Sequence, residues 1–135
     1  MAREILLRYS YSAGFIENIA HCIETHRYKT DKLPKTIEAR VLFDADKLDS
    51  IGAVGIGRDF LFAGEIGARL HNREQDVLAT ATYSQEDTAY REWLVSLQYK
   101  KDKMMTSEGR RIALERHKYM EEFFQRFLKE IEGEL

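Results

Sequence analysis

Residues Val41 to Phe60 read VLFDADKLDSIGAVGIGRDF, and the interpretation of the chain depends on this stretch. It places carboxylates within an otherwise apolar run. If the run is helical, Asp46 and Asp49 lie three residues apart on one face. A carboxylate is costly to bury unless it is paired, hydrogen-bonded or metal-bound, so each acid in the run needs a partner or water. Asp44 is expected to face solvent or to make a structural hydrogen bond.

A run of small residues follows the carboxylates and ends in a cation. Glycine or alanine occupies positions 52, 53, 55 and 57, and Arg58 comes directly after them. Small side chains let a second helix or a ligand approach the backbone closely. Carboxylates before such a run and an arginine behind it predict a site for a metal ion and a phosphate group.

The composition of the chain bounds its class. A length of 135 residues predicts a single domain, residues 1–135, with room for a hydrophobic core. The net charge of −2 argues against a general nucleic-acid-binding surface. The single cysteine, Cys22, excludes an intrachain disulfide and fits a reducing compartment. Because no apolar run approaches a membrane span and no signal-peptide pattern opens the chain, we expect a cytoplasmic location without a membrane partner.

The apolar periodicity predicts an all-α fold. Helices are expected at residues 2–26 (one broken helix or two short ones), 36–51, 52–70 and 86–102, with Thr36 as an N-cap. The last helix begins after Thr106 or Ser107 and has the clearest apolar stripe. That stripe consists of Ala113, His117, Met120, Phe124, Phe127 and Ile131. We interpret His117 as a packed histidine.

The segment before the first loop also has an apolar stripe. Phe15, Ile19, Cys22 and His26 fall at helical spacings on one face. His26 ends this stripe, which from the residues alone is typical of a core or helix-end histidine.

The stretch DADKLDSIGAVGIGRDF resembles the last motif of the HD-domain superfamily of metal-dependent phosphohydrolases. The segment IETH and the tail TSEGRRIALERHKYMEEFFQRFLKE resemble that family too, so the likeness runs from about Tyr11 to the C-terminus. The resemblance implies an HD-domain-like helical bundle of about five or six helices. It also implies hydrolysis of nucleotides or other phosphoesters, assisted by a divalent ion such as Mn²⁺, Ni²⁺ or Mg²⁺.

The resemblance assigns roles to four residues. Asp46 corresponds to the late aspartate of the family, a metal ligand and catalytic residue. His26 corresponds to an imidazole of the metal and substrate pocket, and we expect it to serve as a metal ligand and a substrate-binding residue. Asp49 is then a catalytic group that forms a hydrogen bond either to the substrate or to a residue that coordinates the metal. Arg58 binds the substrate by neutralising phosphate charge.

The chain departs from the family pattern at the other metal ligands. The family has an earlier histidine and an adjacent His-Asp pair, whereas the four histidines here precede Cys22, Arg27, Asn72 and Lys118. The chain therefore resembles an N-terminally truncated HD domain, whose missing segment is supplied upstream, supplied by another subunit, or lost. A histidine and a lysine that face phosphate in relatives correspond to Glu92 and Ser96. Lys100, Lys101 and Lys103 lie a turn or more away.

Two functions follow from this pattern. The first is a metal-dependent phosphohydrolase whose incomplete metal site leaves it weak or inactive alone. The alternative is a non-catalytic helical binding or assembly module that retained the fold. Without the front helices, Gly52–Gly57 and part of the terminal stripe are expected to lack cover, which predicts a homodimer or higher oligomer.

Overall fold

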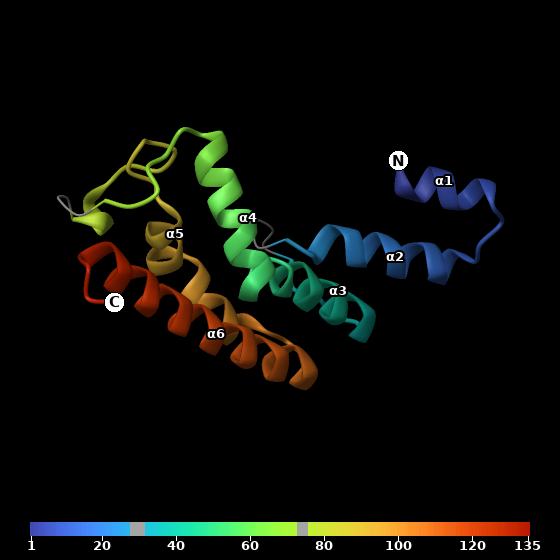
Figure 1. Ribbon diagram of the computed structural model, residues 1–135. Coiled ribbons are helices and arrows are strands. Elements are labelled where there is room, and N and C mark those ends of the chain that lie inside the picture. Colours follow the sequence, from blue (N-terminus) through green and yellow to red (C-terminus); the bar gives the residue numbers. More distant parts are fainter. Residues whose placement is uncertain (28–31, 73–75) are drawn as a thin grey trace.

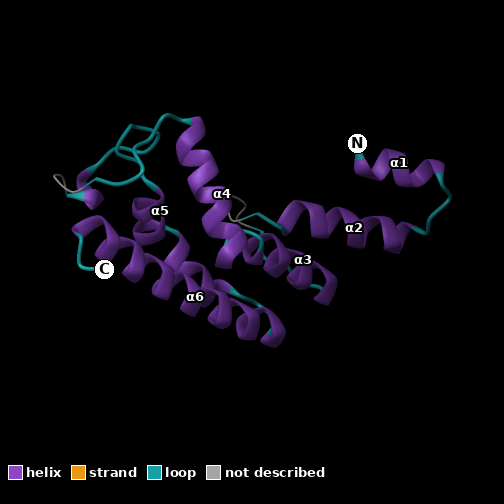
Figure 2. Ribbon diagram, viewed as in Figure 1, coloured by secondary structure: helices purple, strands orange, loops and turns teal. Residues whose placement is uncertain are grey.

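A computed structural model describes residues 1–27, 32–72 and 76–135. These residues form helices and loops without a strand, as Figure 2 shows, so the all-α prediction is confirmed. None of the helices in these ranges is long and apolar enough to cross a membrane. The elements are α1 (Ala2–Arg8), α2 (Ala13–Thr25), α3 (Ile37–Leu48), α4 (Gly52–Glu65), α5 (Ala89–Val95) and α6 (Ser107–Glu132), with 3₁₀ segments η1 (Val77–Ala79) and η2 (Leu97–Lys103).

Helices α3 to α6 pack together, whereas α1 and α2 form an arm to one side (Figure 1). The long helix α6 contacts α3, α4 and η2. Its buried side follows the predicted stripe from Ala113 to Phe124, and Phe127 and Ile131 are half-buried. The core cluster consists of Ile51, Ile56, Trp93, Leu97, Met104, Ala113, Met120 and Phe124.

Several helix boundaries follow local chemistry. The Thr36 side chain accepts from the amide of Ala39 and caps α3, as predicted. The predicted extension of α4 to residue 70 is wrong, because the helix ends at Glu65 and Gly67 adopts a φ of 71°. The predicted helix 86–102 breaks at Ser96, where α5 gives way to the tighter η2.

The apolar stripe predicted for α2 is only half-buried at Ile19, Cys22 and His26, and it is wrong for Phe15. Ile16 and Ala20 face inward, and Phe15 is 47% exposed. Because α2 packs against both α1 and α3, its buried face follows these two neighbours. His26 is the C-cap of this helix.

The glycine run at the start of α4 is covered within the chain on one face. Gly52 packs against the Arg116 side chain, and a Cβ on Gly55 would lie 2.5 Å from the carbonyl carbon of Ser50. The expectation that this run lacks cover is therefore wrong for Gly52 and Gly55, whereas Ala53 and Gly57 are exposed. For the terminal stripe it is wrong for the stripe residues from Ala113 to Phe124, which are buried. Val54 and Leu61 remain exposed on the outer face of α4, and homo-oligomerisation stays a prediction.

A buried carboxylate joins α3 to α6. Asp44 is 2% exposed and accepts hydrogen bonds from the amides of Met105 and Thr106, each at 2.8 Å. The Thr106 hydroxyl donates to the same carboxylate at 2.6 Å and accepts from the amide of Gly109, so it also caps α6. A structural hydrogen bond, one of the two expectations for Asp44, is therefore confirmed.

Replacing Asp44 with alanine should destabilise the fold strongly. Three donors in half-buried residues would lose their buried acceptor, and losses of this kind cost about 1–3 kcal/mol each before relaxation. We expect a decrease of about 3 kcal/mol or more in the free energy of unfolding, measured by urea denaturation. The control is Asp49→Ala at the C-cap of the same helix. Its carboxylate is 63% exposed and should contribute under about 1 kcal/mol. Equal losses in the two variants would contradict the role of Asp44.

Candidate functional site

The last turn of α3 divides the DADKLDS motif between two faces. Phe43, Asp44 and Lys47 point inward and are buried, because positions three and four apart share a face. Asp46 and Asp49 share the opposite face and are exposed to solvent. The two acids that sequence analysis selected therefore lie together at the surface, as their spacing predicts.

Lys47 connects this turn to the end of α2. Its ammonium group lies 2.9 Å from Asp46 Oδ2 and also donates to the backbone carbonyl of His26. It lies 4.1 Å from the ring centroid of Phe43. The carbonyl end of a helix has a partial negative charge, which favours a cation there. Lys47 thus connects Asp46 to the backbone of His26.

The imidazole of His26 has partners at both nitrogens. Nδ1 lies 2.7 Å from the carbonyl oxygen of Ile23, to which it can only donate. In that tautomer Nε2 is an acceptor, and it receives the Nε–H of Arg27 at 3.3 Å. A metal ion or a substrate would have to displace Arg27 to reach this ring.

Arg58 lies in the second turn of α4 and pairs with Asp49. Its guanidinium donates to the carboxylate and to the backbone carbonyl of Asp49. Both side chains are more than half exposed, so the attraction is screened by solvent. The predicted substrate-binding cation and one predicted catalytic acid are therefore direct neighbours.

A charged cavity of about 240 Å³ lies beside these residues. Its lining residues are Asp46, Lys47, Asp49, Ser50, Arg58 and Lys100. Lys100 comes from η2, and sequence analysis placed it outside the site. Burial lowers the pKa of its ammonium group, although nearby carboxylates, Glu92 first, partly oppose that shift.

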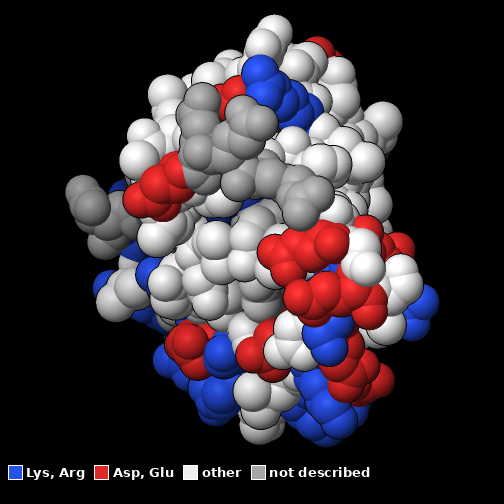
Figure 3. All heavy atoms as spheres, turned by 60° about the vertical axis from the view of Figure 1, so that its left-hand side comes forward, with Lys and Arg blue, Asp and Glu red and all other residues white. Residues whose placement is uncertain are grey.

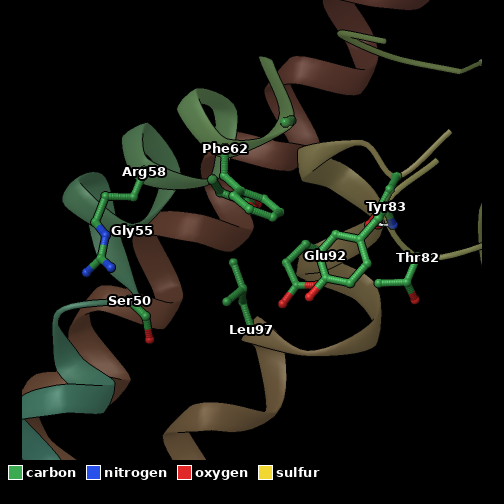
Figure 4. A pocket seen from close by; sticks show the side chains of 11 residues that line it. Ser50, Gly55, Arg58, Phe62, Thr82, Tyr83, Glu92 and Leu97 are labelled. Carbon is green, nitrogen blue, oxygen red and sulfur yellow. Dashed lines mark hydrogen bonds between the residues drawn. The ribbon is translucent and has the colours of Figure 1, made fainter. Parts of the chain in front are cut away.

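An aromatic cavity of about 290 Å³ adjoins the charged cavity and shares Ser50 and Arg58 with it. It lies between α4, α5 and the preceding loop, and Figure 4 shows Phe62, Tyr83 and Glu92 around the same space. The rings of Phe62 and Tyr83 meet edge to face, with centroids 6.0 Å apart. The complete lining is Ser50, Gly55, Arg58, Asp59, Phe62, Ala63, Thr82, Tyr83, Asp87, Glu92 and Leu97.

Tyr83 is held in an uncommon backbone conformation. Its φ is 60°, a value that non-glycine residues rarely adopt. Its amide donates to Asp87 Oδ2 at 2.6 Å, and Arg91 holds the other carboxylate oxygen at 2.7 Å. This buried ion pair fixes the tyrosine at the cavity wall.

Asp59 is a site residue that sequence analysis missed. Its Oδ2 atom is buried and has no hydrogen-bond partner in the described part of the chain. Burial raises the pKa of this carboxyl group to about 7. The carboxylates of Glu92 and Asp87 raise the pKa further, whereas Lys100 lowers it. The signal was its spacing of four residues from both Gly55 and Ala63, which lie on the buried face of α4.

The described residues do not fit a catalytic metal ion. Within residues 1–27, 32–72 and 76–135, no group of three or more histidine, cysteine, aspartate or glutamate side chains could hold a metal. Asp46 pairs with Lys47, and the imidazole of His26 is engaged on both sides. Catalytic zinc sites illustrate the need for about three protein ligands.

The surface charge bears on one further expectation. On the face shown in Figure 3, acidic and basic side chains adjoin each other. Nucleic acids are bound by surfaces of predominantly positive charge, and the expectation about nucleic-acid binding stays a prediction.

Comparison with known proteins gives close structural neighbours. No model of a protein family matches the chain. YpgQ, an uncharacterized protein of Bacillus subtilis (strain 168), is 40% identical over 107 residues, which are 79% of this chain and 46% of YpgQ. A crystal structure of YpgQ has a TM-score of 0.77 at 31% identity, covering 98% of this chain and 63% of that chain. The chain thus spans about half the length of this curated relative.

Two further structures extend the comparison. YpgQ in complex with ADP has a TM-score of 0.73 at 30% identity, over 95% of this chain and 58% of that chain. An HD-superfamily hydrolase from Bacillus thuringiensis has a TM-score of 0.76 at 26% identity, over 96% of this chain and 60% of that chain. The resemblance found in the sequence is confirmed, and the chain has the fold of the HD-domain superfamily.

Proposed function

We propose that the chain forms the aspartate-bearing part of an HD-type phosphohydrolase site and binds a nucleotide or a related phosphoester. On its own it hydrolyses this ligand weakly or not at all. The observation that carries the proposal is the pair of adjoining cavities at the junction of α3, α4 and α5. In this arrangement Arg58 contacts phosphate, and Asp46 and Asp49 border it.

The two cavities suit different parts of a nucleotide. The charged cavity offers the guanidinium of Arg58, which can bind phosphate oxygens in a bidentate manner. The aromatic cavity offers the faces and edges of Phe62 and Tyr83, on which a planar base can pack. Small-molecule sites typically have volumes of roughly 300–1,000 Å³ and few polar groups. The complex of YpgQ with ADP supports a nucleotide as the ligand.

The number of possible metal-coordinating side chains bears on hydrolysis and not on nucleotide binding. Metal-assisted hydrolysis requires ligands beyond those that the described residues bring together. The same observation favours the second candidate function, a non-catalytic module that binds a phosphoester or a partner while retaining the HD fold. Nucleotide turnover distinguishes the two.

The first prediction concerns metal binding by the 135-residue chain. Titration calorimetry with Mn²⁺, Ni²⁺ or Mg²⁺ should show weak binding without stoichiometric saturation at micromolar concentration. Asp46→Asn should change this binding and any nucleotide turnover very little, because one carboxylate paired with Lys47 holds an ion poorly. Tight stoichiometric binding together with Asp46-dependent turnover would overturn this expectation.

The second prediction compares the affinities of ADP and adenosine, which test the two cavities separately. ADP should bind more tightly than adenosine, because only ADP fills the charged cavity. Phe62→Ala should weaken both ligands by about tenfold, the order of magnitude of one aromatic–base contact. Arg58→Gln should weaken ADP alone. Phe15→Ala is a matched control, since Phe15 is 47% and Phe62 44% exposed and Phe15 lies outside both cavities. Equal effects of the two phenylalanine variants would argue against the aromatic cavity.

The third prediction follows from the raised pKa of Asp59. Between about pH 4 and 7 the unfolded chain loses this proton while the folded chain keeps it, so folding stability decreases as pH rises. Asp59→Asn removes this loss. The variant should therefore melt at a higher temperature than the wild type at pH 8, and the difference should shrink at pH 4. A shift of about 1 kcal/mol corresponds to roughly 3–5 °C for a domain of this size.

Differential scanning calorimetry at the two pH values measures this effect. Asp76→Asn supplies a control, because Asp76 is an exposed aspartate outside both cavities. A variant that is less stable than the wild type at pH 8 would show that Asp59 makes a favourable ionic contact instead.

A further inference from the structure

Lys100 is oriented by a short chain of hydrogen bonds. Its ammonium group donates to Ser50 Oγ at 2.7 Å, and the Ser50 hydroxyl donates to the backbone carbonyl of Lys47 at 2.7 Å. The hydroxyl proton is therefore committed to the carbonyl, and the serine oxygen is free to accept from Lys100. An ammonium group has three N–H donors, so two remain after this contact.

The other charges of the charged cavity are already paired. Asp46 pairs with Lys47, and Asp49 pairs with Arg58. Lys100 has a neutral hydroxyl as its partner, and in the described part of the chain no carboxylate lies within ion-pair distance of it. The lining of the charged cavity thus has one positive charge in excess, located on the half-buried Lys100, while the carboxylates of Glu92 and Asp59 in the adjoining cavity act on it without direct contact.

An unbalanced ammonium that is partly removed from water favours an anion beside it. Removing a charge from water is costly unless an opposite charge or hydrogen-bonding partners replace the water. A phosphate oxygen supplies both, in a charge-assisted hydrogen bond. A divalent cation at this position would meet repulsion from Lys47, Arg58 and Lys100.

We propose that Lys100 binds the phosphate group of the ligand directly and without a bridging metal ion, while the organic part of the ligand occupies the aromatic cavity. The proposal rests on the proposed function for the identity of the ligand as a phosphoester. It assigns the phosphate contact to a residue that sequence analysis placed outside the site. In this proposal the ammonium group of Lys100 balances the phosphate charge, a role that a metal ion would otherwise fill.

The test measures binding of inorganic pyrophosphate and of ADP by calorimetry in buffer that contains EDTA. The full chain is compared with Lys100→Gln, Lys100→Arg and Lys103→Gln. Lys103→Gln makes the same change in net charge on the same 3₁₀ segment, outside the charged cavity. Circular dichroism and thermal melting check that each variant is folded.

The expected result is binding in EDTA that Lys100→Gln weakens by about tenfold or more for both ligands, as for loss of a hydrogen bond to a charged group. Lys100→Arg should retain most of the affinity because the charge is kept. Lys103→Gln should stay within about twofold of the wild type.

Four outcomes would overturn the proposal. Equal weakening by Lys100→Gln and Lys103→Gln would reduce the effect to net charge. Loss of binding in EDTA would mean that a metal ion bridges the phosphate. ADP binding that Lys100→Gln leaves unchanged would refute the role of Lys100 and leave the proposed function standing, whereas a wild-type chain that binds neither ligand under any condition would refute both.

Discussion

The buried carboxylate of Asp44 is the contact on which the geometry of the site depends. It accepts three hydrogen bonds from the segment that joins η2 to α6, more than sixty residues later in the chain. This contact fixes η2 against the last turn of α3. Because Lys100 belongs to η2 and Ser50 follows α3, the contact between them depends on that attachment. The site is thus assembled by a structural acid two residues before the acid of the family motif.

The small residues after α3 complete the same assembly from the other side. Gly55 is so close to the backbone of Ser50 that a side chain there would collide with it. Gly52 packs against Arg116, which also donates to the carbonyl of Leu48. Gly52 and Gly55 therefore serve contacts within the chain, and these contacts place the start of α4 so that Arg58 lies beside Asp49.

Local periodicity and the likeness to a known motif were enough to predict the fold and part of the site. The spacing of Asp46 and Asp49 predicted their shared face, and the likeness of DADKLDS to the HD motif predicted the fold. Lys100 was out of reach because its direction depends on the change from α-helix to 3₁₀ helix at Ser96. That change alters the number of residues per turn, and no residue pattern announced it. The positive φ of Tyr83 was equally hidden, since an ion pair between Asp87 and Arg91 supports it.

The two cavities differ in charge, and this difference would orient a ligand. The charged cavity has three cations against two carboxylates, whereas the aromatic cavity adds Asp59, Asp87 and Glu92 to the shared Arg58. A molecule with an anionic end and a hydrogen-bond-donating end would thus be favoured in one direction and disfavoured in the other. Asp59 strengthens this selectivity because its buried Oδ2 has no partner of its own within the described residues. With a pKa near 7, the group changes charge within the physiological range, so the same oxygen pair can accept from a ligand donor or, when protonated, donate to a ligand acceptor.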